Sequence, residues 1–103
     1  MTNRVLVVGV GGDGPAGLPA AIRERIDRAD QLWGGERLLA LWPDHPAEKV
    51  VIRAQVDELA GQLAQRGDQR VVVLSSGDPG FYGIAGTLAR HLLPEELEIV
   101  PHV

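Results

Sequence analysis

The sequence predicts a single α/β domain with a mainly parallel central sheet and flanking helices. Short apolar runs rich in β-branched residues alternate along the chain with stretches whose apolar residues recur at helical spacing. This alternation is typical of βα units, in which helices cover both faces of a parallel sheet. The length of 103 residues is enough for one domain, since domains usually contain about 100–200 residues.

Five runs are predicted to be strands. The strongest signals are the Val/Leu runs at residues 5–8 and 71–74, of which the first is ended by a glycine. Weaker candidates lie at 31–33, 50–52 and 97–100. Ligands of such sheets collect at the carboxyl ends of the strands. The glycine-rich loops after residues 8 and 74 are therefore expected to build one site together.

Helices are predicted between these strands. The first extends from residue 18 to residue 29, and a short second one covers 36–42 before a turn at 43–46. The third presents one apolar stripe made of Val56, Leu59, Ala60, Leu63 and Ala64. Gly67 suits the C-terminal end of that helix. A fourth helix is expected over 81–92, where Pro94 stops it.

Composition and charge exclude several classes of function. Ten basic against fourteen acidic residues give a net charge of −4, so a nucleic-acid partner is not expected. The absence of cysteine excludes disulfides and thiolate metal sites, and the three histidines have no ligand spacing. No apolar run has the length of a membrane span, and the N-terminus lacks the features of a signal peptide. A cytoplasmic location is expected.

The loop after the first strand formally fits G-x-G-x-x-G through Gly9, Gly11 and Gly14. In a dinucleotide-binding oxidoreductase such glycines bring the pyrophosphate to a helix N-terminus. Here Pro15 delays the helix, and Asp13 places a negative charge where a diphosphate would lie. A plain strand-to-helix turn, in a small non-enzymatic binding module, is a third interpretation.

The loop after the fourth strand, at residues 76–83, is more distinctive. Gly77 and Gly80 let backbone approach a ligand, and Ser76 or Asp78 can cap the helix that follows. A capped helix start is the simpler interpretation of the same residues. The neighbouring aromatic residues and the additional glycines favour a binding loop.

A third glycine-bearing turn, Gly34-Gly35-Glu36-Arg37, follows the second predicted strand. The fork of Arg37 can pair with a substrate carboxylate, although an exposed arginine without such a role is the commoner case. Trp42 is expected to pack in the core rather than to stack on a ligand.

Together these segments resemble the tetrapyrrole methylases. The resemblance rests on residues 8–18 (VGVGGDGPAGL) and 76–83 (SGDPGFYG), and it covers the whole chain in order. The intervening residues 34–38 (GGERL) narrow it to the branch of the precorrin-6Y C5,15-methyltransferases and cobalt-precorrin-7 C5-methyltransferases.

The resemblance implies methylation of a corrin-ring precursor by S-adenosyl-L-methionine in cobalamin biosynthesis. The residues that it implies for the methyl donor are Ser76, Gly77, Asp78, Pro79 and Phe81, with Gly9 and Gly11. Those implied for the tetrapyrrole are Asp13, Gly14, Pro15, Gly35, Arg37 and Tyr82. Many relatives carry Gly-Pro-Gly-Asp-Pro where this chain has Gly12-Asp13-Gly14-Pro15. No catalytic acid or base is expected, because a sulfonium methyl group is already activated.

Members of the family have two α/β domains, with the donor held in the cleft between them. The resemblance extends over the N-terminal domain alone, so residues 1–103 are expected to be that domain, with the C-terminal domain missing. An exposed cleft face also makes self-association into a homo-oligomer plausible. The isolated domain is expected to be inactive.

Overall fold

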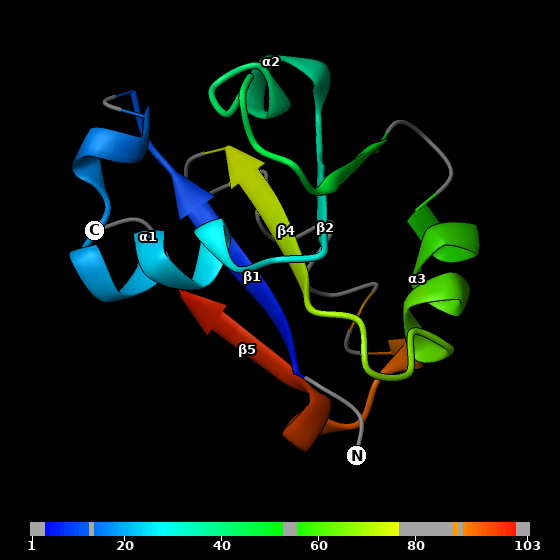
Figure 1. Cartoon of the computed structure of the whole chain (residues 1–103). Helices are drawn as coiled ribbons and strands as arrows, with labels where there is room; N and C mark the ends of the chain where they lie inside the picture. Colours follow the sequence, from blue (N-terminus) through cyan, green and yellow to red (C-terminus); the bar gives the residue numbers. More distant parts are fainter. Residues whose placement is uncertain (1–3, 13, 53–55, 77–87, 89, 101–103) are drawn as a thin grey trace.

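The computed structural model describes residues 4–12, 14–52, 56–76, 88 and 90–100. In these residues five strands form one sheet in the order β3-β2-β4-β1-β5 (Figure 1). The strands are β1 (Val5–Val10), β2 (Gln31–Gly34), β3 (Glu48–Val51), β4 (Val71–Ser76) and β5 (Leu97–Val100). Every pairing described is parallel. The predicted α/β class and parallel sheet are confirmed.

Helices connect the strands as the sequence predicts, with shorter bounds. They are α1 (Ala20–Asp27), α2 (Glu36–Leu39) and α3 (Val56–Ala64), together with the 3₁₀ turns η1 (Gly14–Gly17) and η2 (Pro94–Glu96). Of the fourth predicted helix, residues 88, 90 and 91 are helical, Leu92 lies just after the helix, and residues 81–87 and 89 lie outside the described residues. None of the described helices has both the length and the hydropathy needed to cross a membrane.

Four predicted strand ranges were wrong because pairing decides where a strand ends. β2 ends one residue later than predicted, and β4 two residues later, so Ser75 and Ser76 are strand residues and not part of the loop. β1 continues through Gly9 to Val10, since these two residues pair with the last two residues of β4. Gly9 is therefore a strand residue and not part of the loop. β3 begins at Glu48 because Gln31 pairs with it, and it ends one residue earlier than predicted.

Two predicted helices are shorter than the sequence pattern indicates. α1 begins only at Ala20, because Pro19 is its N-cap and has a non-helical ψ of 149°. α2 ends at Leu39, after which the N–H of Trp42 bonds the carbonyl of Leu39 at 3.1 Å in a tight turn. Ala64 is exposed rather than part of the buried stripe of α3, since it is the last residue of that helix.

Alternation along the strands divides the core between the two faces of the sheet. Leu6, Val8, Val72 and Leu74 pack on one face with Ile26 of α1, in a cluster that also contains Trp42, as predicted. Val5, Val7, Val71 and Val73 pack on the other face, where they join Leu59 and Leu63 of α3 and the later residues Leu88 and Leu92. Figure 1 shows α1 and α3 on opposite sides of the strands.

The segments that follow the neighbouring strands β1 and β4 pack on opposite faces of the sheet. α1, which follows β1, packs on the first face through Ile26. Leu88 and Leu92, which follow β4 in sequence, pack on the second face. The carboxyl ends of β1 and β4 thus meet at a topological switch point, the place where open α/β sheets bind ligands.

Candidate functional site

β1 and β4 run in register to their last residues. Val8 lies beside Leu74, Gly9 beside Ser75, and Val10 beside Ser76. The two glycine-rich segments consequently start next to each other, one at Gly11 and the other directly after Ser76. The expectation that both lie at one edge of the sheet is confirmed for the residues that the structure describes.

The first loop is a tight turn that does not lead directly into a helix. The N–H of Gly14 donates to the carbonyl of Gly11 at 3.0 Å, and Gly14 has φ of +61°. This left-handed conformation favours glycine because it has no Cβ. η1 then delays α1 to Ala20. The dinucleotide interpretation is not favoured, because it needs a helix N-terminus close to the third glycine.

The two glycines of the third turn have different surroundings: Gly34 is tightly packed and Gly35 is open. A Cβ added at Gly34 would lie 3.2 Å from both Cβ and the carbonyl oxygen of Leu74, so Gly34 allows β2 to approach β4. A Cβ added at Gly35 would meet nothing within 4 Å. Arg37, two residues further on in α2, is exposed.

Contacts link the first glycine turn to the segment that follows the third. A Cβ added at Gly14 would lie 3.6 Å from both terminal methyl groups of Leu41, which follows α2. Pro15 and Trp42 line one hollow of about 280 Å³ beside α1. Since β2, β4 and β1 are consecutive parallel strands, the strand ends that precede the three glycine-bearing segments share one edge of the sheet.

Two glycines at the carboxyl edge have open space where a Cβ would lie. A Cβ added at Gly12 would meet nothing within 4 Å, which is also the case at Gly35. Ser75, 7% exposed and beside Gly9, adds a buried hydroxyl at the boundary of β1 and β4. The sequence pattern alone does not single out Ser75, although the serines after the apolar run are consistent with a strand that continues beyond Leu74.

Several predicted site residues lie outside the described part of the chain. These are Asp13, Gly77, Asp78, Pro79, Phe81 and Tyr82. Ser76 is placed as the last residue of β4. Within the described ranges, no group of three or more His, Asp or Glu side chains is arranged to hold a metal ion.

Residues 4–103 match the family model of the Tetrapyrrole (Corrin/Porphyrin) Methylases, and the chain belongs to this family. It is 44% identical over 96 residues to a cobalt-precorrin-7 C(5)-methyltransferase of Salmonella typhimurium, covering 89% of this chain and 47% of that protein. It is 36% identical over 106 residues to a decarboxylating precorrin-6Y C(5,15)-methyltransferase of Sinorhizobium sp, covering 92% of this chain and 23% of that one.

A solved structure gives the same result for the fold. The uroporphyrin-III C-methyltransferase of Thermus thermophilus, complexed with S-adenosylhomocysteine, superimposes with a TM-score of 0.71 at 28% identity. The match covers 98% of this chain and 45% of that structure. The chain thus spans about half the length of the Salmonella relative and of this structure, and less of the Sinorhizobium protein.

Proposed function

We propose that this chain is the donor-binding N-terminal domain of an S-adenosylmethionine-dependent methyltransferase that acts on a corrin-ring precursor. One observation carries the proposal: β1 and β4 end together at a switch point with a glycine-rich segment after each strand. The names of the Salmonella and Sinorhizobium relatives support methylation of the precorrin-6Y or cobalt-precorrin-7 type. The complex of the Thermus enzyme supports S-adenosylmethionine as the donor.

The proposed donor site combines the end of β1 with the segment that follows β4. Its residues are Gly9, Gly11, Ser76, Gly77, Asp78, Pro79 and Phe81. Backbone N–H groups suit the carboxylate of the donor's amino-acid end, and the carboxylate of Asp78 suits its cationic groups. Gly9 contributes as a strand residue that pairs with Ser75.

The proposed tetrapyrrole site lies on the side of the first and third glycine turns. Its residues are Asp13, Gly14, Pro15, Gly35, Arg37 and Tyr82. The open space at Gly35 and the exposed position of Arg37 fit a large ligand with carboxylate side chains.

The chemistry asks for positioning rather than for proton transfer. When bound, S-adenosylmethionine supplies a methyl group that its sulfonium already activates. The chain's own part is to fix the donor through backbone groups and to keep water from the cleft. No side chain of this domain is proposed as a catalytic acid or base.

The domain acts as half of a cleft in this proposal. A second domain, of a size that would account for the doubled length of the Salmonella relative, closes over the donor from the other side. We therefore expect the 103-residue chain alone to show no measurable methyl transfer. A cytoplasmic location and self-association through the uncovered cleft face complete the proposal.

The test is the replacement Gly77→Val in the chain joined to a second domain of the family. A branched side chain at the proposed donor loop should raise the dissociation constant of S-adenosylhomocysteine at least about tenfold, or 1.4 kcal/mol. Calorimetric titration measures this constant, and the melting temperature without ligand should change little.

Gly67→Val is the matched control. Gly67 has φ of +63° and follows α3, at the opposite edge of the sheet from the loops. Its replacement should lower the melting temperature and leave donor affinity within about twofold. Unchanged affinity in Gly77→Val would exclude this loop as the donor site. Preference for NAD over S-adenosylhomocysteine would instead support the oxidoreductase alternative, and a response to neither would support a binding module.

A further inference from the structure

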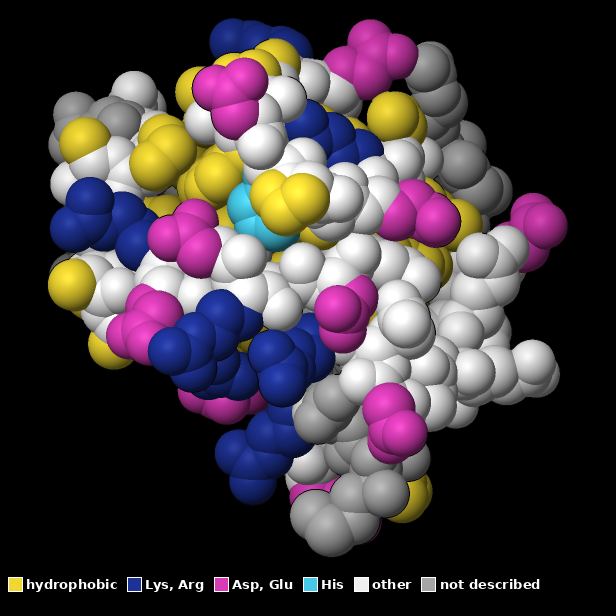
Figure 2. Space-filling view, viewed as in Figure 1, with side chains coloured by type: hydrophobic (Ala, Val, Ile, Leu, Met, Phe, Trp, Pro, Cys, Tyr) yellow, Lys and Arg dark blue, Asp and Glu magenta, His cyan; other side chains and the backbone are white. Residues whose placement is uncertain are grey.

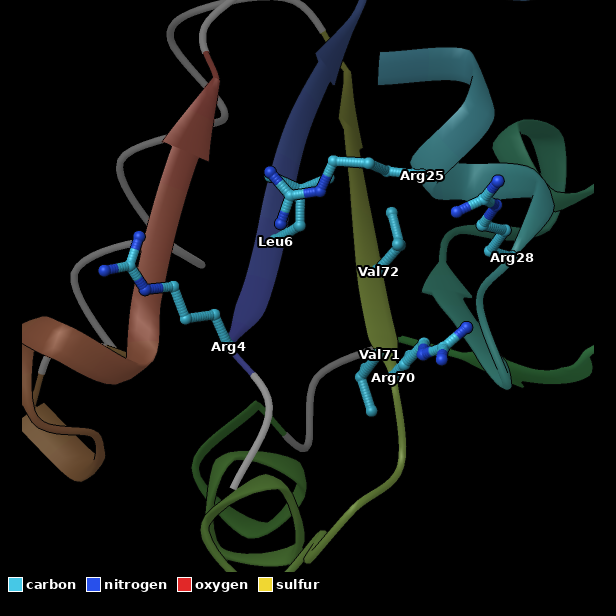
Figure 3. A pocket seen from close by; sticks show the side chains of 7 residues that line it. All are labelled: Arg4, Leu6, Arg25, Arg28, Arg70, Val71 and Val72. Carbon is cyan, nitrogen blue, oxygen red and sulfur yellow. The ribbon is translucent and has the colours of Figure 1, made fainter. Parts of the chain in front are cut away.

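A hollow of about 260 Å³ lies at the amino-terminal edge of the sheet, away from the loops of the proposed donor site. Four arginines and three apolar residues line it: Arg4, Arg25, Arg28, Arg70, Leu6, Val71 and Val72. Figure 3 shows the guanidinium groups of Arg4 and Arg25 toward β5, and those of Arg28 and Arg70 on the other side of Leu6 and Val72. The hollow thus has cationic walls on two sides and an apolar floor.

The fold brings these arginines together from three separate segments. Leu6 pairs with Val72, so Arg4 and Arg70 stand at equivalent positions, two residues before that pair on neighbouring parallel strands. Alternation places both on the face that α1 covers. Arg25 and Arg28 are three residues apart at the C-terminal end of α1, and this spacing puts them on one side of the helix.

Carboxylates already compensate three of the four cations. Arg25 contacts Glu98 at 2.9 Å and Arg28 contacts Glu24 at 2.7 Å, while Arg4 lies 3.8 Å from Glu98. These pairs are partly exposed, and such ion pairs contribute little stability. An anion of higher charge can therefore compete with the two glutamates.

Arg70 is different from the other three. Its backbone N–H donates to the carboxylate of Asp30 at 2.8 Å, and its carbonyl accepts from the N–H of Asp30 at the same distance. These contacts fix the backbone. Among the described residues, the guanidinium of Arg70 has no hydrogen-bond or ion-pair partner.

The hollow is rich in positive charge, although the chain as a whole carries a net negative charge. Four of the ten Lys and Arg residues line this hollow, although the net charge of the chain is −4. No Asp or Glu is among the described residues that line it. In the space-filling view of Figure 2, dark blue Lys and Arg side chains gather below the centre of the face shown, and magenta Asp and Glu side chains lie around them.

We propose that this hollow binds a phosphate group. A carboxylate has two oxygens in one plane and suits a single guanidinium fork, whereas a tetrahedral phosphate directs oxygens toward both walls. The small volume fits the phosphate itself, since pockets for larger ligands usually measure about 300–1,000 Å³. The group can belong to free phosphate or to a nucleotide, and the test distinguishes the two.

The test titrates inorganic phosphate into the 103-residue chain at constant ionic strength, with NMR of the arginine Nε–H groups as the readout. Saturable shifts are expected at Arg70 and Arg28, with none from acetate. Arg70→Gln should weaken phosphate binding about fivefold. Arg23→Gln removes an exposed arginine of α1 that does not line the hollow, and it should bind phosphate as the parent does.

Adenosine diphosphate is titrated in parallel. If adenosine diphosphate binds more tightly than phosphate, and Arg70→Gln abolishes this difference, the natural source of the group is a nucleotide. If the two bind equally, the source is free phosphate. Equal phosphate affinity of the Arg70→Gln and Arg23→Gln variants would overturn the proposal. Acetate shifts as large as those of phosphate would overturn it as well. Because none of these readouts involves methyl transfer, they are independent of the proposed donor site.

Discussion

At the amino-terminal edge of the sheet, side chains tie neighbouring segments together, whereas the contacts at the carboxyl edge come from backbone and glycine. The guanidinium of Arg66 contacts Glu96 before β5, and the ring of His45 joins the end of α1 to the segment before β3. At the other edge, Gly14 bonds Gly11, and the N–H of Ile52 donates to the carbonyl of Gly34 at 2.8 Å. The contrast indicates that side-chain contacts at the first edge hold the fold, whereas the second edge is available to the methyl donor.

The largest effect on stability is expected from Arg66→Ala. The Arg66 side chain is 2% exposed, contacts Glu96 at 3.2 Å and donates to the carbonyl of Leu63 at 2.8 Å. Removing it leaves a partly buried carboxylate without this partner, which should lower the free energy of unfolding by about 3 kcal/mol. Urea denaturation measures the change. The free energy of unfolding of the exposed control Arg23→Ala should stay within about 0.5 kcal/mol of the parent value. A loss below about 1 kcal/mol for Arg66→Ala would contradict the difference between the two edges.

The replacement His45→Ala should cost about 2 kcal/mol at the same edge. The Nδ1 atom accepts the N–H of Ala47 at 2.9 Å, so the proton is on Nε2, which donates to the carbonyl of Ile26 at 2.7 Å. Alanine leaves both backbone groups without these partners. Thermal unfolding compares this variant with Asp44→Ala, an exposed neighbour, which should melt like the parent. Equal melting of the two variants would show that the ring bonds contribute nothing.

At the carboxyl edge, adjacent glycines should respond differently to alanine. Gly34→Ala places a Cβ 3.2 Å from the Leu74 backbone oxygen, so β2 and β4 must separate slightly, at a cost of about 1.5 kcal/mol. Gly35→Ala enters open space and should cost a few tenths of a kcal/mol. Denaturant midpoints of the two variants measure the difference. A larger loss in Gly35→Ala would mean that Gly35 has a packing role and is not open to ligand.

The smallest difference is expected in the first loop. Gly14→Ala forces a side chain onto a residue with φ of +61°, a cost of about 1 kcal/mol. Gly12→Ala has open space around the new Cβ and should stay within about 0.5 kcal/mol. Hydrogen exchange of the Gly14 amide, which bonds Gly11, should accelerate in Gly14→Ala alone. Equal acceleration in both variants would show that the turn does not depend on the left-handed residue.

Strand identity and sheet class could be predicted because the apolar runs are strong local signals. Residues 71–74 are buried on both faces, as their composition predicts. Bounds were less predictable, because they depend on a partner strand. Gly9 carries no strand signal of its own and separates Val10 from the apolar run, yet both are strand residues because they pair with Ser75 and Ser76.

The sequence was sufficient to predict which loops form the site, but not which residues contact one another there. The order of β-strands and glycine turns was sufficient to place two loops at one edge, because parallel strands end together. The contact between Gly14 and Leu41, and the close approach of Gly34 to Leu74, depend on how α2 packs and leave no pattern in the sequence. The arginine-lined hollow was missed for the same reason, since Arg4, Arg25 and Arg70 are far apart in the chain and meet only through the β1–β4 register.

The most direct test of the contrast between the edges is an amide NMR titration with S-adenosylhomocysteine. The ¹⁵N-labelled chain, joined to a second domain of the family, is titrated to saturation. We predict the largest shifts at Val10, Gly11 and Ser76, where β1 and β4 end together. The amides of Arg4 and Arg70, at the opposite ends of the same strands, should not move. Saturable shifts at Arg4 and Arg70 with none at Gly11 and Ser76 would contradict the assignment of donor binding to the carboxyl edge.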